Sequence, residues 1–412
     1  MTRNKGSKTC NSVDLSGLPN WAQINLVGAV FSVASSLAGE ARIVGGSVRD
    51  WLAGVPVGDI DMAVNRPIET FAAECTTHGI KVVETGLQFG TVTLVDGATH
   101  IEVTQTRRDV ETDGRHAVVA HCDDWQTDAR RRDFTVNALY LDHSGRVHDP
   151  LGGRADLEAG YLRFVGVAAD RVQEDALRML RYCRFLPRFL EGGIDKAARE
   201  ALGDHAALCA SLSGERVAQE MRRIMVTDEV TTVIELMRET ALDRHALGLA
   251  LSPAGLSQLT ADADARSEPM GWLLALAVAM PAGSAAMLAK RLRLSGADST
   301  ALASFDSGVM NDDLAILDSP QWQQAAYQLW PYASERYVVQ SCRNHITYDR
   351  CRRDQIRHWV RPEFPLRGAD LLSHGVDNGP ALGQMLNAAR RRWISSNFTL
   401  GKEALLEWLI GN

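Results

Sequence analysis

Hydrophobic side chains recur at two different spacings in the first third of this 412-residue chain. Residues 20–39 carry them at a helical spacing and end at Gly39, a residue typical of helix C-termini, so this segment predicts a helix. Short runs separated by glycines follow and predict strands at ARIVGG, IDMAV, IKVVET, GTVTLV and THIEVTQT. One helical stretch, IETFAAECTTHG, interrupts them, so we expect a mixed α/β domain built on a small sheet.

The strand pattern largely disappears from about Tyr161, and the rest of the chain carries hydrophobic positions at helical spacing. The fold class is therefore expected to be α+β, with an N-terminal sheet domain followed by an extended all-helical region. Glycine and proline clusters suggest where that region divides. We expect a sheet domain over residues 1–157 and helical domains over 158–235, 236–340 and 341–412.

One segment between the last predicted strand and the helical region departs from both patterns. Residues 111–128, ETDGRHAVVAHCDDWQTD, have little periodicity and many polar side chains. A long segment without secondary structure in a compact domain is usually functional or disordered. We therefore expect a long loop at this position.

Composition bears on the cellular location of the protein and on the use of its cysteines. The chain is 45% hydrophobic but has no run of eighteen apolar residues, and its first residues, MTRNKGSKTCNSVD, contain no apolar segment. We therefore expect no membrane association and a cytoplasmic location. The seven cysteines are scattered without a C-x-x-C pair, which argues against a zinc ribbon and against a disulfide framework.

The net charge of the chain says less about its binding partners than the local distribution of charged residues does. The formal net charge of -7 argues weakly against a surface coated by nucleic acid, although arginines cluster at 130–132, 352–353 and 390–392. Such clusters are more often solvated helix faces than binding sites. No feature of the sequence indicates an obligate protein partner.

Two aspartates stand inside one of the predicted strands. Residues i and i+2 of a strand point to the same face, so Asp59 and Asp61 would present two carboxylates side by side. Such a pair suits Mg²⁺, which takes one or two carboxylates and completes its shell with water and phosphate oxygens. Glu102, on another predicted strand, is a candidate third acid. The alternative is that Asp59 ends a turn and Asp61 forms an ordinary salt bridge.

A glycine pair lies just before these aspartates. Gly45 and Gly46 follow a predicted strand and precede a helical segment, SVRDWLAG. Backbone amides at a turn of this kind can bind an anion, and glycine lets a phosphate approach closely. Arg49 lies one helical turn further on and can reach the same anion. A glycine pair alone usually marks a tight turn, but beside two aspartates it predicts a triphosphate site next to a metal site.

Five motifs then occur in a fixed order over residues 41–221: GGSVRDWLAG…GDIDMAV, RRDFTVNALY, HDPLGGRADL, QEDALRMLRYCRF and SGERVAQEM. This series resembles the nucleotidyltransferase superfamily that includes DNA polymerase β. Within it, the motifs are similar to the class II branch of tRNA CCA-adding enzymes and bacterial poly(A) polymerases. The resemblance implies a polymerase-β-like catalytic head, a neck with a nucleotide-recognition helix, a body and a tRNA-binding tail. It also implies a two-metal reaction with two Mg²⁺ ions, in which Glu102 could instead position the primer hydroxyl.

Base choice is assigned to the motif QEDALRMLRYCRF. Cytosine and adenine both present an amino donor beside an unprotonated ring nitrogen, which a carboxylate and an arginine can pair with. Asp175 and Arg178 are therefore expected to admit CTP and ATP and to exclude UTP and GTP. We expect both on one helical stripe with two further arginines, Arg181 and Arg184. The resemblance adds three nucleotide-binding residues from the RRD motif, namely Arg132, Asp133 and Asn137.

The five motifs do not by themselves decide the product, because poly(A) polymerases share most of them. The segment containing Asp113, Gly114 and Arg115 resembles the flexible loop that CCA-adding enzymes use and CC-adding enzymes lack. This favours completion of the 3′-terminal CCA of tRNA from CTP and ATP. Alternatives are a poly(A) polymerase, a CC-adding enzyme and a non-catalytic RNA-binding module. The tail has arginine-rich segments at 352–361 and 388–393, with Trp359 and Trp393, that could contact tRNA phosphates or could simply be structural.

Overall fold

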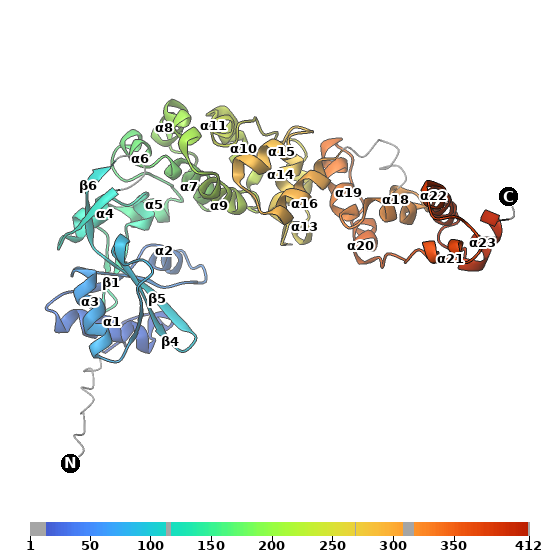
Figure 1. The fold of residues 1–412 in the computed structure, drawn as a ribbon. Helices are drawn as coiled ribbons and strands as arrows, with labels where there is room; N and C mark the ends of the chain where they lie inside the picture. Colours follow the sequence, from blue (N-terminus) through green and yellow to red (C-terminus); the bar gives the residue numbers. More distant parts are fainter. Residues whose placement is uncertain (1–13, 113–116, 268, 308–316, 411–412) are drawn as a thin grey trace, which may run out of the picture. The chain divides into compact units, whose positions relative to one another are not determined.

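A computed structural model describes residues 14–112, 117–267, 269–307 and 317–410. The chain divides into two compact units, which are described separately. The first contains Met1–Leu212 with Glu239–Ala246, and the second contains Ser213–Arg238 with Leu247–Asn412. All strands among the described residues belong to the first unit (Figure 1), so the expected α+β class is confirmed.

A mixed sheet forms the centre of the first unit. Within the described residues its seven strands are ordered β3-β4-β5-β2-β1-β8-β9. Only β2 and β5 pair in parallel, and the other neighbours pair antiparallel. The strands are β1 (Ala41–Val44), β2 (Asp61–Val64), β3 (Lys81–Val83), β4 (Thr91–Asp96), β5 (Thr99–Gln105), β8 (Tyr140–Leu141) and β9 (Val147–His148).

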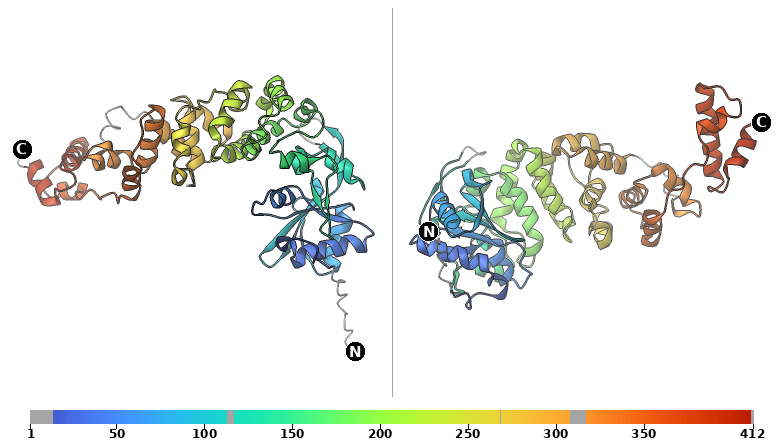
Figure 2. Two further views of the ribbon diagram at one scale, coloured as in Figure 1. Left: turned by 180° about the vertical axis from the view of Figure 1, so that it is seen from behind. Right: turned by 60° about the horizontal axis from the view of Figure 1, so that its bottom comes forward.

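Two helices cover one face of this sheet, α1 (Asn25–Ser36) and α3 (Ile68–Thr77) (Figure 1, Figure 2). Alternate strand residues such as Ile43, Met62 and Val103 pack against them in one hydrophobic core. The prediction that Gly39 caps the first helix was wrong. The helix ends at Ser36, and Ala38 takes the left-handed conformation with φ +52°.

A smaller cluster covers the opposite face. Val44 and Ala63 point there and pack with Ala129, Ala138 and Tyr140. Ala129 belongs to α4 (Trp125–Arg130), which begins at the N-cap residue Asp124. Because Asp61 lies two residues before Ala63 on the same strand, its side chain is directed to this face.

The segment predicted as a long loop is largely regular, so that prediction was wrong for the residues described. The strands β6 (Arg107–Thr112) and β7 (Ala117–His121) pair antiparallel as a hairpin, and α4 follows. Sequence periodicity missed the hairpin because ladder hydrogen bonds join backbones and do not need an alternating hydrophobic pattern on both strands. The candidate loop residues Asp113, Gly114 and Arg115 lie outside the described residues.

Short helices complete the first unit. Before β8 these are η1 (Asn20–Ala22), α2 (Gly46–Leu52), η2 (Leu87–Phe89) and η3 (Thr135–Asn137). After the sheet come α5 (Gly153–Glu158), α6 (Ala168–Glu174), α7 (Leu177–Phe185), η4 (Leu186–Phe189), α8 (Lys196–His205) and η5 (Ala206–Ser211). Two more helices, α10 (Val230–Glu239) and α11 (Leu242–Leu247), contain residues of both units.

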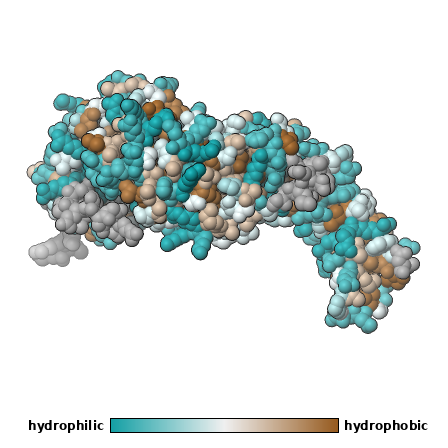
Figure 3. All heavy atoms as spheres, turned by 90° about the horizontal axis from the view of Figure 1, so that it is seen from above, coloured by the Kyte–Doolittle hydropathy of each residue, from teal (hydrophilic) through white to brown (hydrophobic). Residues whose placement is uncertain are grey.

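The described residues of the second unit form helices and connecting loops, with no strands. Its helices are α9 (Gly214–Ile224), α12 (Leu256–Thr260), α13 (Ala263–Ser267), α14 (Gly271–Ala279), α15 (Ala285–Leu292), α16 (Gly296–Asp306), α18 (Trp322–Leu329), α19 (Ala333–Arg343), α20 (Arg350–His358), α21 (Gly368–Leu372), α22 (Pro380–Ser395) and α23 (Lys402–Ile410). Hydrophilic residues cover most of the face drawn in Figure 3, where hydrophobic residues form separate small areas. None of the helices described is long and apolar enough to cross a membrane.

The arginine- and tryptophan-rich tail segments are partly structural. Trp393 is 2% exposed and lies in a hydrophobic core with residues of α21 and α23. Arg353 is 3% exposed, and its guanidinium pairs with the buried Asp262. Of the two alternatives left open by the sequence, the structural role therefore fits Trp393 and Arg353. Trp359 is only partly buried and packs against Phe398.

Candidate active site

The two predicted aspartates lie at the beginning of the central strand β2, but only one of them is on the strand. Asp61 is the first residue of β2, whereas Asp59 lies in the loop before it. The prediction that both belong to the strand was therefore wrong. The β2–β5 ladder begins at Asp61 and the β1–β2 ladder at Met62, so no backbone pairing extends the strand as far as Asp59.

Glu102 lies directly opposite Asp61 on the parallel strand β5. Burial, Glu102 and Asp59 together raise the pKa of Asp61 to about 6, while Arg132 acts in the opposite direction. The carboxylates thus repel each other, as expected of oxygen ligands that need a cation. Among the described residues, however, no three Asp, Glu, His or Cys side chains are arranged closely enough to hold a metal ion by themselves.

The Gly45–Gly46 turn lies between two guanidinium groups. Gly45 has φ +71°, a conformation that favours glycine, and α2 begins at Gly46. A methyl group on Gly45 would lie 3.3 Å from Nη1 of Arg132, and one on Gly46 would lie 3.6 Å from Nη2 of Arg49. The absence of side chains at this turn therefore leaves room for both guanidiniums beside its backbone. Arg132 thus lies close to Gly45 and Gly46, the residues predicted to bind a triphosphate.

The RRD segment connects this turn to the helical part of the first unit. Arg49 Nη1 donates to Asn137 Oδ1 at 2.6 Å, and Asn137 Nδ2 donates to Asp133 Oδ1 at 3.0 Å. The other carboxylate oxygen of Asp133 accepts from Arg181 Nε at 2.7 Å. Burial opposes ionisation of Asp133, but Arg181 holds its pKa below the usual value. The structure therefore joins four of the predicted nucleotide-binding residues in one hydrogen-bonded chain.

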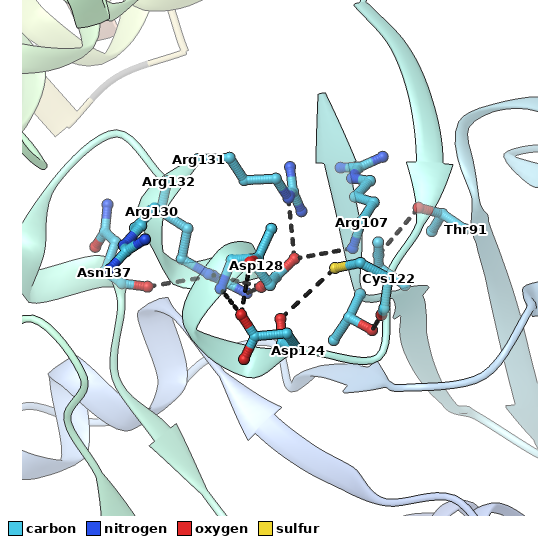
Figure 4. Close-up of polar contacts among 12 residues, drawn as sticks. Thr91, Arg107, Cys122, Asp124, Asp128, Arg130, Arg131, Arg132 and Asn137 are labelled. Atoms are coloured by element: carbon cyan, nitrogen blue, oxygen red, sulfur yellow. Dashed lines mark hydrogen bonds and ion pairs between the residues drawn. The ribbon is translucent and has the colours of Figure 1, made fainter. Parts of the chain in front are cut away.

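Asp128 is a site residue that sequence reasoning missed. Its side chain is 1% exposed, and it accepts from Arg131 Nε at 2.9 Å and from Arg132 Nη2 at 3.2 Å (Figure 4). It also accepts from the hydroxyl of Tyr140 at 3.0 Å. Burial opposes its ionisation, but Arg132 and Arg131 outweigh burial and keep the pKa of Asp128 low. The available signal was the i,i+4 spacing of Asp128 and Arg132 at the end of a helix.

The predicted base-recognition stripe is only partly on one helix. Asp175 has extended backbone angles and lies between α6 and α7, where its carboxylate accepts from the backbone N–H of Leu177 at 3.0 Å. The prediction that Asp175 shares the helix with the arginines was therefore wrong. An aspartate just before a helix can accept from a backbone N–H that has no partner within the helix, which favours a helix start after Asp175.

The three arginines of the stripe lie on α7 itself. Arg178 donates from Nη1 to Glu174 at 2.7 Å and from Nη2 to the carbonyl of Arg131 at 3.0 Å. Arg181 pairs with Asp133, and the guanidinium carbon of Arg184 lies 4.3 Å from the ring centre of Phe185. Helix α7 thus packs against the RRD segment, and both terminal nitrogens of the Arg178 guanidinium have hydrogen-bond partners.

Two family models match parts of this chain. The model described as "Poly A polymerase head domain" matches residues 41–163, and "Probable RNA and SrmB- binding site of polymerase A" matches residues 193–247. The mouse (Mus musculus) protein "CCA tRNA nucleotidyltransferase 1, mitochondrial" is 32% identical over 389 residues, covering 90% of this chain and 86% of the relative. The "CCA-adding enzyme" of Lactobacillus delbrueckii is 29% identical over 381 residues and covers 90% and 93%.

Solved structures agree with these relatives. The crystal structure of the Bacillus stearothermophilus CCA-adding enzyme in complex with CTP superposes with a TM-score of 0.74 at 25% identity, covering 96% of this chain and 98% of that one. The similarity extends over both units and is not confined to the sheet domain. From its sequence motifs, its fold and these relatives, the chain belongs to the family of CCA tRNA nucleotidyltransferases.

Proposed function

We propose that this protein builds or repairs the 3′-terminal CCA of tRNA without a nucleic-acid template, using CTP and ATP and releasing pyrophosphate. The observation that carries the proposal is that the carboxylates around Asp61 lie next to the guanidiniums of Arg49 and Arg132 at the glycine turn. Asp61 lies within the electrostatic reach of Glu102, Asp59 and Arg132, and Arg132 also borders the Gly45–Gly46 turn. Such a site has a place for a metal ion next to a place for a triphosphate.

Enzymes of this family use divalent metal ions. We propose two Mg²⁺ ions, held by Asp59 and Asp61 and completed by water and substrate oxygens, since these carboxylates are hard oxygen ligands that repel one another when no cation is present. Bound there, the ions would make the RNA 3′-hydroxyl more acidic and stabilise charge on the phosphates. Glu102 would add a third negative group beside them, or would position the primer hydroxyl.

The arginines are proposed to hold the nucleotide. Arg49 and Arg132 would contact the phosphates from either side of the glycine turn, and Arg181 and Arg184 would approach from α7. Asp133 and Asn137 would face the sugar. Asp175 and Arg178 would read the Watson–Crick edge, since their hydrogen-bonding groups match cytosine and adenine and mismatch uracil and guanine.

The rest of the chain would bind tRNA. We propose a catalytic head at 1–157, a neck at 158–235, a body at 236–340 and a tail at 341–412. In the tail, the guanidinium carbons of Arg352, Arg361 and Arg390 lie 4.1 to 5.5 Å from the ring centres of aromatic side chains. Guanidiniums held beside aromatic rings in this way are suited to phosphate contacts.

The function is tested by incubating the purified protein with tRNA that lacks its 3′ end, Mg²⁺ and each labelled nucleotide. Two CTP additions followed by one ATP addition are expected. Long adenylate tracts would instead identify a poly(A) polymerase, and incorporation of CTP alone would identify a CC-adding enzyme. Binding of tRNA without any incorporation would identify a non-catalytic RNA-binding module.

Asp128→Asn should weaken binding of both nucleotides and destabilise the sheet domain. The substitution removes a buried charge that two arginines share, and breaking such a pair costs about 3–5 kcal/mol. We expect a lower melting temperature and a higher KM for CTP and for ATP. Asp123→Asn is the matched control, because the side chain of Asp123 is 74% exposed. Wild-type KM values in the Asp128 variant would contradict the assignment of Arg132 to the nucleotide.

A further inference from the structure

Asp50 belongs to α2 and links this helix to η4, the short helix that follows the recognition helix α7. Its Oδ1 accepts from Arg49 Nε at 2.8 Å and from Arg188 Nη2 at 2.7 Å. Arg188 belongs to η4, which follows α7 directly. One carboxylate therefore binds two guanidiniums from segments about 140 residues apart in the sequence.

Phe185 lies among three guanidiniums. The guanidinium carbons of Arg184, Arg49 and Arg181 are 4.3, 5.0 and 5.6 Å from its ring centre. The negative face of an aromatic ring attracts cations, so the ring can hold like charges near one another. Phe185 is itself fixed by an edge contact with Phe134, whose ring centre is 5.7 Å away.

These contacts restrain Arg49 from three directions. Asp50 binds its Nε and Nη2, Asn137 accepts from its Nη1, and the ring of Phe185 lies nearby. The Arg49 side chain is only 6% exposed, so little space remains for another orientation. The planar guanidinium of Arg49 is therefore held in one orientation beside the Gly45–Gly46 turn.

We propose that Asp50, Arg188 and Phe185 are positioning residues that fix Arg49 for the triphosphate, and so set the affinity for every nucleotide without affecting base choice. This inference rests on the proposed function. None of the three residues needs to touch the substrate. Because the triphosphate is common to all four nucleotides, a loosened Arg49 should weaken CTP and ATP binding equally.

The inference predicts a particular kinetic pattern. Asp50→Asn, Arg188→Gln and Phe185→Leu should each raise KM for CTP and for ATP about tenfold, with kcat changed by less than about threefold. The ratio of kcat/KM for CTP to that for UTP should stay as in the wild type. Arg188→Lys and Phe185→Tyr should restore most of the affinity, because they keep the charge and the ring.

The matched control is Arg199→Gln, which removes an ion pair with Glu239 at 2.6 Å elsewhere in the first unit. It should leave both KM values unchanged. Thermal unfolding of each variant separates positioning from stability. A lower melting temperature with wild-type KM values would overturn the inference, and so would loss of discrimination against UTP in any of the three variants.

Failure of the proposed function would be recognised separately, because the wild-type protein would then incorporate neither nucleotide. The dissociation constant of Mg-ATP decides the inference in that case. Binding about tenfold weaker in Asp50→Asn than in the wild type would support it, and equal binding would overturn it.

Discussion

Asp61→Asn should abolish incorporation of both CTP and ATP, reducing kcat by about a thousandfold or more. The amide keeps the shape of the side chain but removes the charge through which Asp61 would hold a metal ion. Stabilisation of transition-state charge by a bound metal contributes several kcal/mol, and each 1.36 kcal/mol corresponds to about a tenfold change in rate. Since both nucleotides would react at the same metal site, both activities should disappear together.

The fold should survive this substitution. The pKa of Asp61 is raised to about 6, above the ordinary value of 3.8. The folded state therefore binds this proton more tightly than the unfolded state does, and the stability gained from the proton is lost as pH rises through about 6. At pH 8, replacing the repelled carboxylate by a neutral amide should not lower the melting temperature measured without metal. Asp96→Asn, at the exposed end of β4, is the control and should keep full activity. An active Asp61→Asn enzyme would contradict the metal assignment.

Strand and helix types were predictable in the sheet domain because burial there follows a simple period. The five predicted strands and the helix at residues 68–77 are all present, since their hydrophobic positions face one core. The same periodicity also indicates that Glu102 and Asp61 point away from that core. Their direct opposition could not be predicted, because it depends on the register between β2 and β5, which hydrophobic alternation does not specify.

Errors occurred where hydrogen bonds, not hydrophobic periods, decide the structure. Asp175 leaves the recognition helix because its carboxylate satisfies the amide of Leu177. Asp128 was missed because its i,i+4 spacing from Arg132 does not distinguish it from an aspartate on an exposed helix face, and its burial and its contact with Tyr140 arise only in the fold. The burial of Arg353 likewise depends on Asp262, 91 residues earlier in the chain.

Asp175→Asn should let the enzyme accept UTP. The asparagine oxygen can still accept the N–H of Leu177, so the start of α7 should be preserved. The change removes a pure acceptor and introduces an amide, which can donate to the carbonyl of uracil. A mismatched hydrogen bond costs about 1–3 kcal/mol, so kcat/KM for UTP relative to CTP should rise by about 10- to 100-fold. Single-nucleotide incorporation into tRNA lacking its 3′ end measures this ratio.

A control is needed because Arg178, the proposed partner of Asp175, also holds the fold. Its guanidinium binds Glu174 and the carbonyl of Arg131, so replacing Arg178 would disturb both packing and base recognition. Glu174→Gln removes the ion pair but leaves Asp175 and Arg178 in place, and should therefore keep the exclusion of UTP and GTP. If Asp175→Asn also excluded UTP as strongly as the wild type, Asp175 would be a helix cap without a role in base choice. Selection of cytosine and adenine would then have to come from other groups near α7, since the arginines around Phe185 are proposed to bind the phosphates, which all four nucleotides share.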